Sequence, residues 1–400
     1  METAPQELDA QRQDRAREYA RIRRRLMLLN LVLGFAYLSL WLLLGWARSL
    51  QPALAELAAP IFPAGPPWWV MLLLTATAIG LPWSIATSPL SYYRGFVLPH
   101  RFDLSTQDLR GWLVDQAKGM AVSTAIGVPL LIGLFSVIRE TPDTWWLWAA
   151  ALYTVVTAVL AALAPVLLLP IFFDVEDLPD EYRALRERLV TLAEAAGTRI
   201  EGVFQIDMSR RTKEANAALA GLGKTRRILL GDTLLESFSA DEIETVLAHE
   251  LAHHVHGDIP ILITAQAVLN FGAFYLVSVG LGAALGPLSL DGPADPAGLP
   301  LIALLLGAFA LVTMPLTNGF SRWRERLADE YALNLTRKPE AFMSAMRRLA
   351  NQNLAEADPE RWVVWLLASH PPLRDRIERA ERKEELYAQL AAHEDTQTQT

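Results

Sequence analysis

The chain of 400 residues is 52% hydrophobic and 20% charged, with a formal net charge of −8 at neutral pH. This composition is too apolar for an ordinary soluble protein of this length. Cysteine is absent, which excludes disulfide bonds and thiolate metal ligands. A metal ion in this chain would therefore be held by histidine and carboxylate side chains.

The apolar residues gather in six segments, each long enough or nearly long enough to cross a bilayer as a helix, which takes about 20 residues. The segments are 26–46, 68–88, 120–138, 146–170, 259–285 and 299–316. A run of arginines precedes the first segment, which is too long for a signal peptide, so we interpret it as a retained anchor. These segments predict an all-α multi-pass membrane protein.

The basic residues predict the orientation of these spans. If the basic N-terminal segment 1–25 is cytoplasmic, the loop 89–119, the polar block 171–258 and the tail 317–400 are also cytoplasmic, and all carry Lys and Arg. The loops on the opposite side contain only two basic residues, Arg48 and Arg139. We therefore expect five regions after the N-terminal segment: a four-span region (26–170), a cytoplasmic catalytic region (171–258), a two-span region (259–316), a catalytic C-terminal region (317–390) and a disordered tail (391–400). If the organism is prokaryotic, we expect the protein in the plasma membrane.

The polar block shows its own secondary structure. Leucines at helical spacing predict an amphipathic helix over 180–196, followed by a strand over 200–207. The sequences ANAALAG and RRILLGDTLL predict a hairpin around 221–224. Ser239 and Glu242 form a capping box, so a helix should begin there and run to about 256, where Gly257 ends it. Beyond 338 we expect charged helices interrupted at the two prolines 371 and 372.

The predicted helix 239–256 carries a possible metal site. His249 and His253 lie four residues apart and project from one face, a separation at which two imidazoles can bind one ion. Glu250 can reach a water held by that ion, so H-E-x-x-H on a helix is typical of zinc hydrolases. The alternative is a polar helix end, where histidines interact favourably with the helix dipole. His254 and His256 point elsewhere, and we assign them a surface or supporting role.

A catalytic zinc needs a third protein ligand, and the best candidates follow the last span. Within TNGFSRWRERLADEYA (317–332), Glu325 and Asp329 again lie four residues apart on one helical face. One could bind the metal while the other accepts a hydrogen bond from a ligand histidine. A charged helix face with Arg–Glu pairs is the alternative reading. Spacing by itself leaves both open.

Taken together, these motifs resemble the type I CAAX prenyl proteases and, more distantly, HtpX-like membrane peptidases. HELAH (249–253) and SRWRERLADEYA (321–332) look like the family's H-E-x-x-H and S-R-x-x-E-x-x-A-D motifs. DMSRRTKEANAALAGLGKTRRILLGDTLL (207–235) and ASHPPLRDRI (368–377) resemble two further family blocks, and 88–119 resembles its cytoplasmic loop. The resemblance covers about 85–375 in the family's order.

The resemblance implies a fold and a site. The fold is a helical membrane barrel that encloses a chamber, with a small hairpin or sheet and one zinc ion near the cytoplasmic side. Glu250 would be the general base, Asp329 would orient a ligand histidine, and His370 and Arg376 would line the site. The implied zinc ligands are His249, His253 and Glu325.

The same resemblance implies a substrate-binding strand. Asn216, Ala217 and Ala218 would bind the substrate backbone as an added edge. Ala218 stands where the family has tyrosine, and six spans stand where eukaryotic members have seven.

We therefore predict an integral-membrane zinc metalloendopeptidase of the CAAX prenyl protease type. Its partners would be a peptide or protein substrate, including a prenylated C-terminal tail, and membrane lipid, with no nucleic acid. Two alternatives stay open: an HtpX-like peptidase for membrane-protein quality control, and a non-enzymatic membrane protein with a structural metal.

Overall fold

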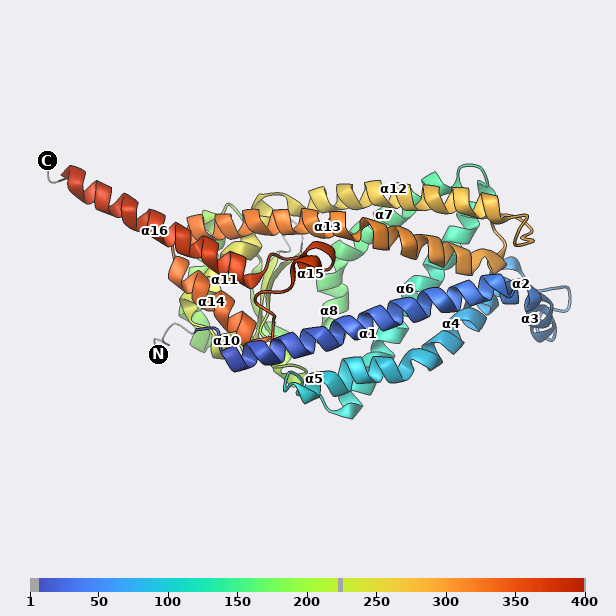
Figure 1. The fold of residues 1–400 in the computed structure, drawn as a ribbon, viewed down its shortest axis with the longest axis horizontal. Helices are drawn as coiled ribbons and strands as arrows, with labels where there is room; N and C mark the ends of the chain where they lie inside the picture. The colour runs from blue at the N-terminus through green and yellow to red at the C-terminus, as the bar shows by residue number, and fades with distance from the viewer. Residues whose placement is uncertain (1–6, 222–225, 399–400) are drawn as a thin grey trace.

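The computed structural model describes residues 7–221 and 226–398, with backbone only for 394–398. The molecule is elongated (Figure 1). A small sheet and several short helices occupy one end, and α2 (Trp46–Ser49) and α3 (Gln51–Ala58) lie at the other. Long helices run between the two ends. We call the end with the sheet the metal end, because the histidine-rich helix lies there.

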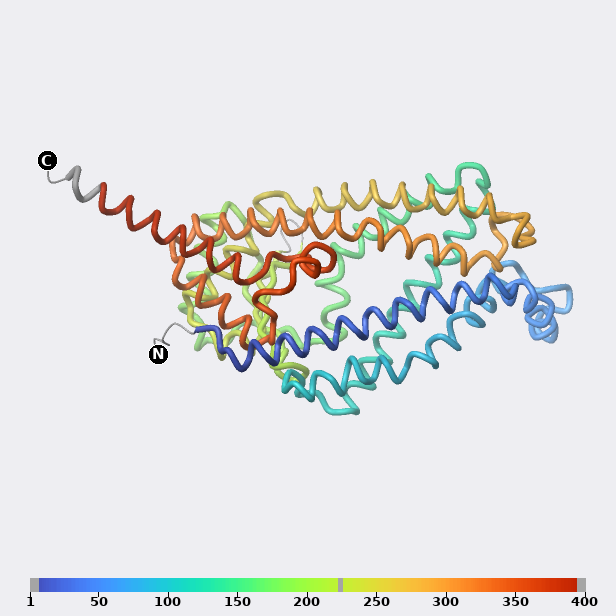
Figure 2. The backbone as a smooth tube through the Cα atoms, in the orientation of Figure 1, coloured from blue at the N-terminus to red at the C-terminus, as the bar shows by residue number. Residues whose placement is uncertain are grey.

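Six long helices form the membrane part, which confirms the predicted number of spans. Contacts between successive helices, and between the last and the first, close them into a ring. Figure 2 traces the same path along the backbone. The helices are α1 (Ala10–Leu43), α4 (Trp68–Tyr92), α6 (Leu109–Glu140), α7 (Trp145–Leu163), α12 (Asp258–Ala284) and α13 (Leu299–Thr336).

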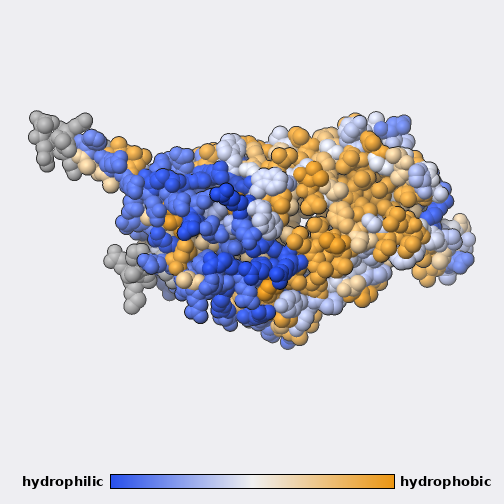
Figure 3. Space-filling model, viewed as in Figure 1, coloured by the Kyte–Doolittle hydropathy of each residue, from blue (hydrophilic) through white to orange (hydrophobic). Residues whose placement is uncertain are grey.

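Hydrophobic side chains cover the ring, whereas hydrophilic ones cover the metal end (Figure 3). A cavity of about 710 Å³ lies between α6, α7, α12 and α13, and its walls are mostly apolar. Short π-helical turns continue two of the helices towards the metal end. The added elements are η1 (Tyr93–Val97) and α5 (Leu98–Arg101) after α4, and η2 (Ala164–Leu168) and α8 (Leu169–Phe172) after α7.

Several ring helices extend well beyond the apolar segments. α1 already begins at Ala10, and α13 continues without interruption to Thr336. The arginine-rich start of α1 packs on the metal end: Gln13 Oε1 accepts a hydrogen bond from Ala357 N–H (3.0 Å), and Arg24 pairs with Glu356 (2.7 Å). This segment, which we expected to act only as an orientation signal, is therefore also a structural arm.

A four-stranded mixed sheet lies at the metal end, in the order β1-β2-β4-β3. The predicted hairpin is confirmed, because β3 and β4 pair antiparallel, although residues 222–225 of its turn lie outside the described part. The parallel pairing of β2 with β4 and the short β1 were not predicted. The strands are β1 (Val175–Asp177), β2 (Gly202–Ile206), β3 (Ala217–Ala220) and β4 (Arg227–Gly231).

The other helices lie mostly at the metal end, where at least three of them contact the sheet. They are η3 (Asp180–Tyr182), α9 (Arg183–Ala195), η4 (Met208–Arg210), α10 (Asp232–Ser237), α11 (Ala240–Val255), α14 (Pro339–Gln352), α15 (Arg361–Leu366) and α16 (Leu373–Thr398), with η6 (Pro296–Gly298) at the opposite end. The break at Pro371 and Pro372 is as predicted. α16 continues through most of the segment 391–400, which we expected to be disordered.

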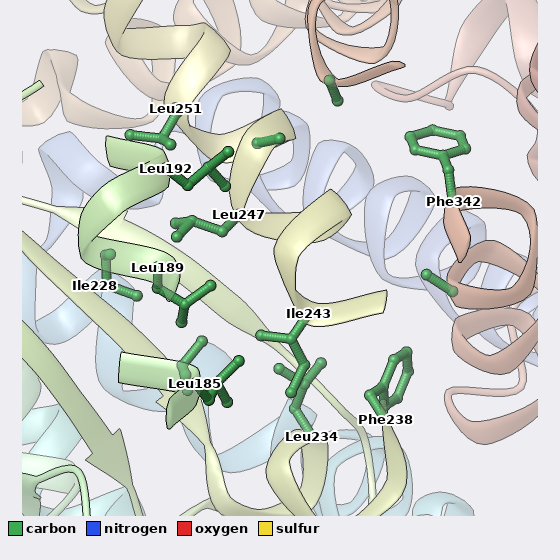
Figure 4. Close-up of a cluster of buried hydrophobic side chains, with 14 of the residues drawn as sticks. Leu185, Leu189, Leu192, Ile228, Leu234, Phe238, Ile243, Leu247, Leu251 and Phe342 are labelled. Carbon is green, nitrogen blue, oxygen red and sulfur yellow. The ribbon is translucent and has the colours of Figure 1, made fainter. Parts of the chain in front are cut away.

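The core of the metal end fixes α11, the helix with the histidines. Leu189 and Leu192 of α9 are buried with Leu247 and Leu251 of α11, and they point towards one another (Figure 4). Leu247 and Leu251 are four residues apart, so they share one face of α11. Burying each such leucine is worth about 2 kcal/mol. The face that carries His249 is thereby held towards α13.

Both ends of α11 follow the sequence signals. Ser239 and Glu242 form both hydrogen bonds of the predicted capping box. At the other end, Gly257 has a φ of +64°, a left-handed conformation that favours glycine. The chain then turns directly into α12, so the metal end and the ring are joined without a linker.

Candidate active site

The two histidines of the motif lie side by side on α11. The ring centroids of His249 and His253 are 5.0 Å apart. One ligand atom each from His249, His253 and Glu325 lies within 4.8 Å of the others. α11 and α13, which are separated in the chain by α12, thus bring together the three residues that were predicted as metal ligands.

Asp329 orients the first of these histidines. His249 Nδ1 lies 3.0 Å from Asp329 Oδ1, so its Nε2 faces Glu325. Burial would lower the pKa of His249, but the carboxylates of Asp329 and Glu325 outweigh burial and raise that pKa to about 9. A metal ion must displace a proton to bind Nε2, because only neutral imidazole is a ligand. Asp329 thus lies where the sequence placed it, behind a histidine.

Asp258 orients the second histidine, His253. This role of Asp258 was not predicted from the sequence. His253 Nδ1 donates to Asp258 Oδ2 at 2.6 Å, and Asp258 pairs in turn with the buried Arg324 of α13. Burial, reinforced by the positive charge of His249, lowers the pKa of His253, which favours the neutral imidazole that binds metal. An acidic residue just after the helix-ending Gly257 was the available signal.

The third side chain, Glu325, faces both imidazoles. Its Oε2 lies 3.2 Å from His249 Nε2, and its Oε1 lies 3.5 Å from His253 Nε2. Oε2 is buried next to ring nitrogens of His249 and His370. Two imidazole nitrogens and a carboxylate oxygen form the donor set of a catalytic zinc with three protein ligands. The residues therefore fit a divalent metal ion.

Glu250 and His370 are available to act on a substrate. Glu250 is half-buried on α11, and it forms no ion pair with any residue that the structure describes. His370 Nδ1 lies 2.9 Å from Glu325 Oε2, and its side chain is 62% exposed. His370 thus sits at the open side of the three convergent groups, as the sequence interpretation required of a residue that lines the site.

Arg376, which we expected to line the site, contacts both His249 and Asp329. It is only 8% exposed, and its Nε lies 3.0 Å from Asp329 Oδ2. Burial would lower the pKa of Arg376, but the charge and hydrogen bond of Asp329 and the nearby glutamates together outweigh burial and raise that pKa. Arg376 therefore contacts the carboxylate that orients His249, behind the metal ligands. This contact explains how Asp329 stays ionised while it is buried.

The remaining histidines of the motif contact protein groups. His254 Nε2 donates to the carbonyl of Leu219 in β3, at 3.3 Å. The ring of His256 packs against that of Tyr331, with centroids 5.4 Å apart. β3, whose residues we expected to bind substrate, is the edge of the sheet and lies beside α11. Asn216, just before it, is exposed, and Ala217 and Ala218 are half-buried.

Two family models together match nearly all of the chain. The model of peptidase family M48 matches residues 179–384, and that of the CAAX prenyl protease N-terminal region, described as five membrane helices, matches residues 2–174. The first match covers β2, β3 and β4 of the sheet, α11 and the part of α13 that carries Glu325. The chain belongs to peptidase family M48.

Curated relatives and a solved structure agree with this membership. An uncharacterized metalloprotease of Bacillus subtilis is 29% identical, covering 75% of this chain and 71% of the relative. CAAX prenyl protease 1 of Saccharomyces cerevisiae is also 29% identical, over 75% and 70%, and its human homologue is 26% identical, over 77% and 72%. The crystal structure of S. mikatae Ste24p has the same fold, with a TM-score of 0.82, 24% identity and coverage of 93% and 89%.

The protein is thus a membrane zinc metalloprotease of the CAAX prenyl protease type. Its substrates are peptides or proteins. Among our alternatives, the non-enzymatic membrane protein is excluded by this membership.

Proposed function

We propose that His249, His253 and Glu325 hold one zinc ion and that Glu250 acts as the general base of peptide hydrolysis. The observation that carries the proposal is the orientation of the two imidazoles. Each has its Nδ1 against a carboxylate, so each aims its Nε2 at Glu325. Two histidines that met by chance would have no reason to be oriented in the same sense.

The chain's own residues account for the proton transfers. Zinc, when bound, supplies Lewis-acid polarisation of the scissile carbonyl and makes water a stronger acid. Glu250 takes a proton from the attacking water at its carboxylate and delivers it to the leaving amine. His370, on the exposed side of Glu325, is placed to donate a hydrogen bond to the carbonyl oxygen as negative charge develops there. Asp329 and Arg376 keep His249 in position.

We further propose that the substrate enters as an extended strand beside β3 and carries a prenylated C-terminal tail. The unpaired edge of β3 next to α11 supports the first part. The relatives named CAAX prenyl protease 1 support the second. The largely apolar cavity between α6, α7, α12 and α13 offers a hydrophobic group a place within the ring.

A pair of peptides tests the substrate proposal. The purified protein should cleave a farnesylated peptide ending in Cys-aliphatic-aliphatic-X faster than its unprenylated twin. Equal rates would remove lipid-directed specificity and favour general proteolysis in the membrane. Glu250→Gln should abolish cleavage of both peptides and leave the metal content unchanged. Full activity of this variant would remove Glu250 from its role.

We also propose that the metal end faces the cytoplasm, as the distribution of basic residues predicts. The chain lacks cysteine, so a single introduced thiol reports the side on which it lies. Arg199→Cys, at an exposed position just before β2, should react with a membrane-impermeant thiol reagent only after the cells are opened. Reaction in intact cells would reverse the orientation.

A further inference from the structure

The free edge of β3 exposes the backbone of alternate residues. Gly231 N–H donates to Asn216 O (3.0 Å), so Asn216 points towards β4. The antiparallel register pairs Ala217 with Leu230 and Leu219 with Ile228. In such a ladder the residues alternate between bonding the neighbouring strand and facing away from it. Ala217 and Leu219 therefore direct their N–H and C=O groups to the free edge.

Ala215 belongs to the same alternating set. Its side chain packs on the same core cluster as those of Ala217 and Leu219, as residues two apart in an extended chain do. The residue before Ala215, Glu214, directs its carbonyl the other way, where it accepts a hydrogen bond from Thr233 Oγ1 (2.8 Å). The groups that a docking strand could use are thus those of Ala215, Ala217 and Leu219.

Asn353 already occupies both groups of Ala215. Its Oδ1 accepts from Ala215 N–H at 2.8 Å, and its Nδ2 donates to Ala215 O at 3.0 Å. A primary amide that bonds both groups of one residue reproduces the pairing that a neighbouring strand would make. Asn353 lies in the turn after α14, where Leu354 adopts a left-handed φ of +44°.

His254 closes the other end of the edge. Its Nε2 donates to Leu219 O, so that carbonyl is no longer open to a substrate N–H. Between Asn353 and His254, Ala217 keeps both of its outward groups, and within the described part of the chain no hydrogen bond to them is found outside the sheet. Leu219 keeps only its N–H.

We propose that Asn353 and His254 are positioning residues that limit substrate pairing to one window, centred on Ala217. This inference rests on the proposed docking of substrate on β3. One substrate residue exchanges both backbone hydrogen bonds with Ala217, and a carbonyl two residues along accepts from Leu219 N–H. Beyond Asn353 the substrate has no backbone partner, so it must leave the sheet or end there.

Backbone N-methylation of the peptide substrate locates the window. The probe is a peptide ending in Cys-aliphatic-aliphatic-X, farnesylated or bare, with one N-methyl group moved along it and the cut bond fixed by mass spectrometry. In the wild type, methylation at the residue opposite Ala217 should raise KM about 3- to 10-fold, whereas methylation two residues further, opposite Ala215, should have no effect.

Asn353→Ala should open the pair at Ala215. The unmethylated peptide then gains a partner, and a second sensitive position appears two residues from the first, again with a change of about 3- to 10-fold in KM and a nearly unchanged kcat. Independently of activity, the amide of Ala215 should exchange hydrogen faster in this variant, because its acceptor is gone.

Asn351→Ala is the matched control. Asn351 lies two residues earlier, at the end of α14, and its amide bonds the backbone of Glu7 and Asp9 just before α1 instead of β3. It should lower stability without adding a sensitive position. A methylation pattern that stays unchanged in Asn353→Ala, or that changes equally in Asn351→Ala, overturns the window while leaving the protease itself intact. A wild type that cleaves neither peptide overturns both proposals.

Discussion

The metal end and the membrane ring bury their polar groups in opposite ways. At the metal end, buried charged side chains form ion pairs: Arg376 with Asp329, Arg324 with Asp258, and Glu242 with Arg348. In the apolar segments of the described ring, only Thr75 and Asn270 are buried polar residues. Breaking a buried ion pair costs about 3–5 kcal/mol, whereas hydrogen bonds between membrane helices average about 0.6 kcal/mol. Substitutions at the metal end and in the ring should therefore differ in the size of their effect and in the property that they change.

The largest effect should come from Glu325→Gln at the metal end. The neutral amide is a poor metal ligand, so metal affinity should fall at least about 100-fold and peptide cleavage should disappear with it. Metal analysis after dialysis measures the loss. Glu330→Gln is the control, because Glu330 lies on the same helix with a side chain that is 60% exposed. Unchanged metal content in Glu325→Gln would mean that another residue is the third metal ligand.

Asp258→Asn should have the next largest effect, because it disturbs two contacts together. His253 loses the carboxylate that orients it, which lowers metal affinity about 10- to 100-fold, and Arg324 is left without its buried partner. Competition with a chelator gives the affinity. Asp358→Asn removes an exposed carboxylate paired with Arg374 and should change nothing. An effect on stability without one on metal affinity would contradict the role of Asp258 behind His253.

A substitution in the ring should act on stability and leave the metal site unchanged. Asn270 Nδ2 donates to Thr154 Oγ1 at 3.0 Å, which links α12 to α7. Asn270→Ala should lower the unfolding free energy by about 0.6 kcal/mol, and metal occupancy should stay at the wild-type level. Thermal unfolding in detergent, with metal analysis of the same sample, checks both. Loss of metal in this variant would show that packing in the ring affects the metal site.

The smallest effect concerns pH at the edge of the metal end. Hydrogen bonds from Lys338 and Arg188 hold the pKa of Asp241 below its usual range. A lowered carboxyl pKa stabilises the fold above the unfolded pKa of about 3.9, and this stabilisation is lost as pH falls further. Because these side chains are partly exposed, the contribution should stay below about 1 kcal/mol.

Comparison with Asp241→Asn measures this contribution. The wild type should unfold at a higher temperature than the variant above about pH 5, and the difference should shrink as pH falls below about 3.9. A difference that grew on acidification would reverse the assignment.

Local signals predicted the elements that depend on local interactions. The capping box at Ser239 and the left-handed Gly257 fixed the limits of α11, and apolar length fixed the six spans. The choice between Glu325 and Asp329 could not be made from spacing, because both lie on the same face of α13. It depends on how far α13 advances along α11, and that is set by tertiary packing. The family resemblance supplied this choice.

Other contacts were missed for the same reason. Asn353 and Ala215 are far apart in the chain, and no periodicity marks an amide that will bond a strand edge. β1 has only three residues, too few for an alternating pattern to be recognised. The contact of Arg376 with Asp329 was not predicted, because a motif gives the identity of a residue without the direction of its side chain.

α13 is one continuous helix, so its membrane-spanning part is directly connected to the proposed metal ligand Glu325. Glu325 lies nine residues beyond Leu316, the last residue of the apolar segment, which is about 13 Å along the helix axis. Pro315 lies at that boundary, where a helix bends most easily. A change in tilt of about 5° would carry the carboxylate about 1 Å relative to the histidines of α11. Membrane thickness, which is one influence on helix tilt, would thus affect how tightly the enzyme holds its metal.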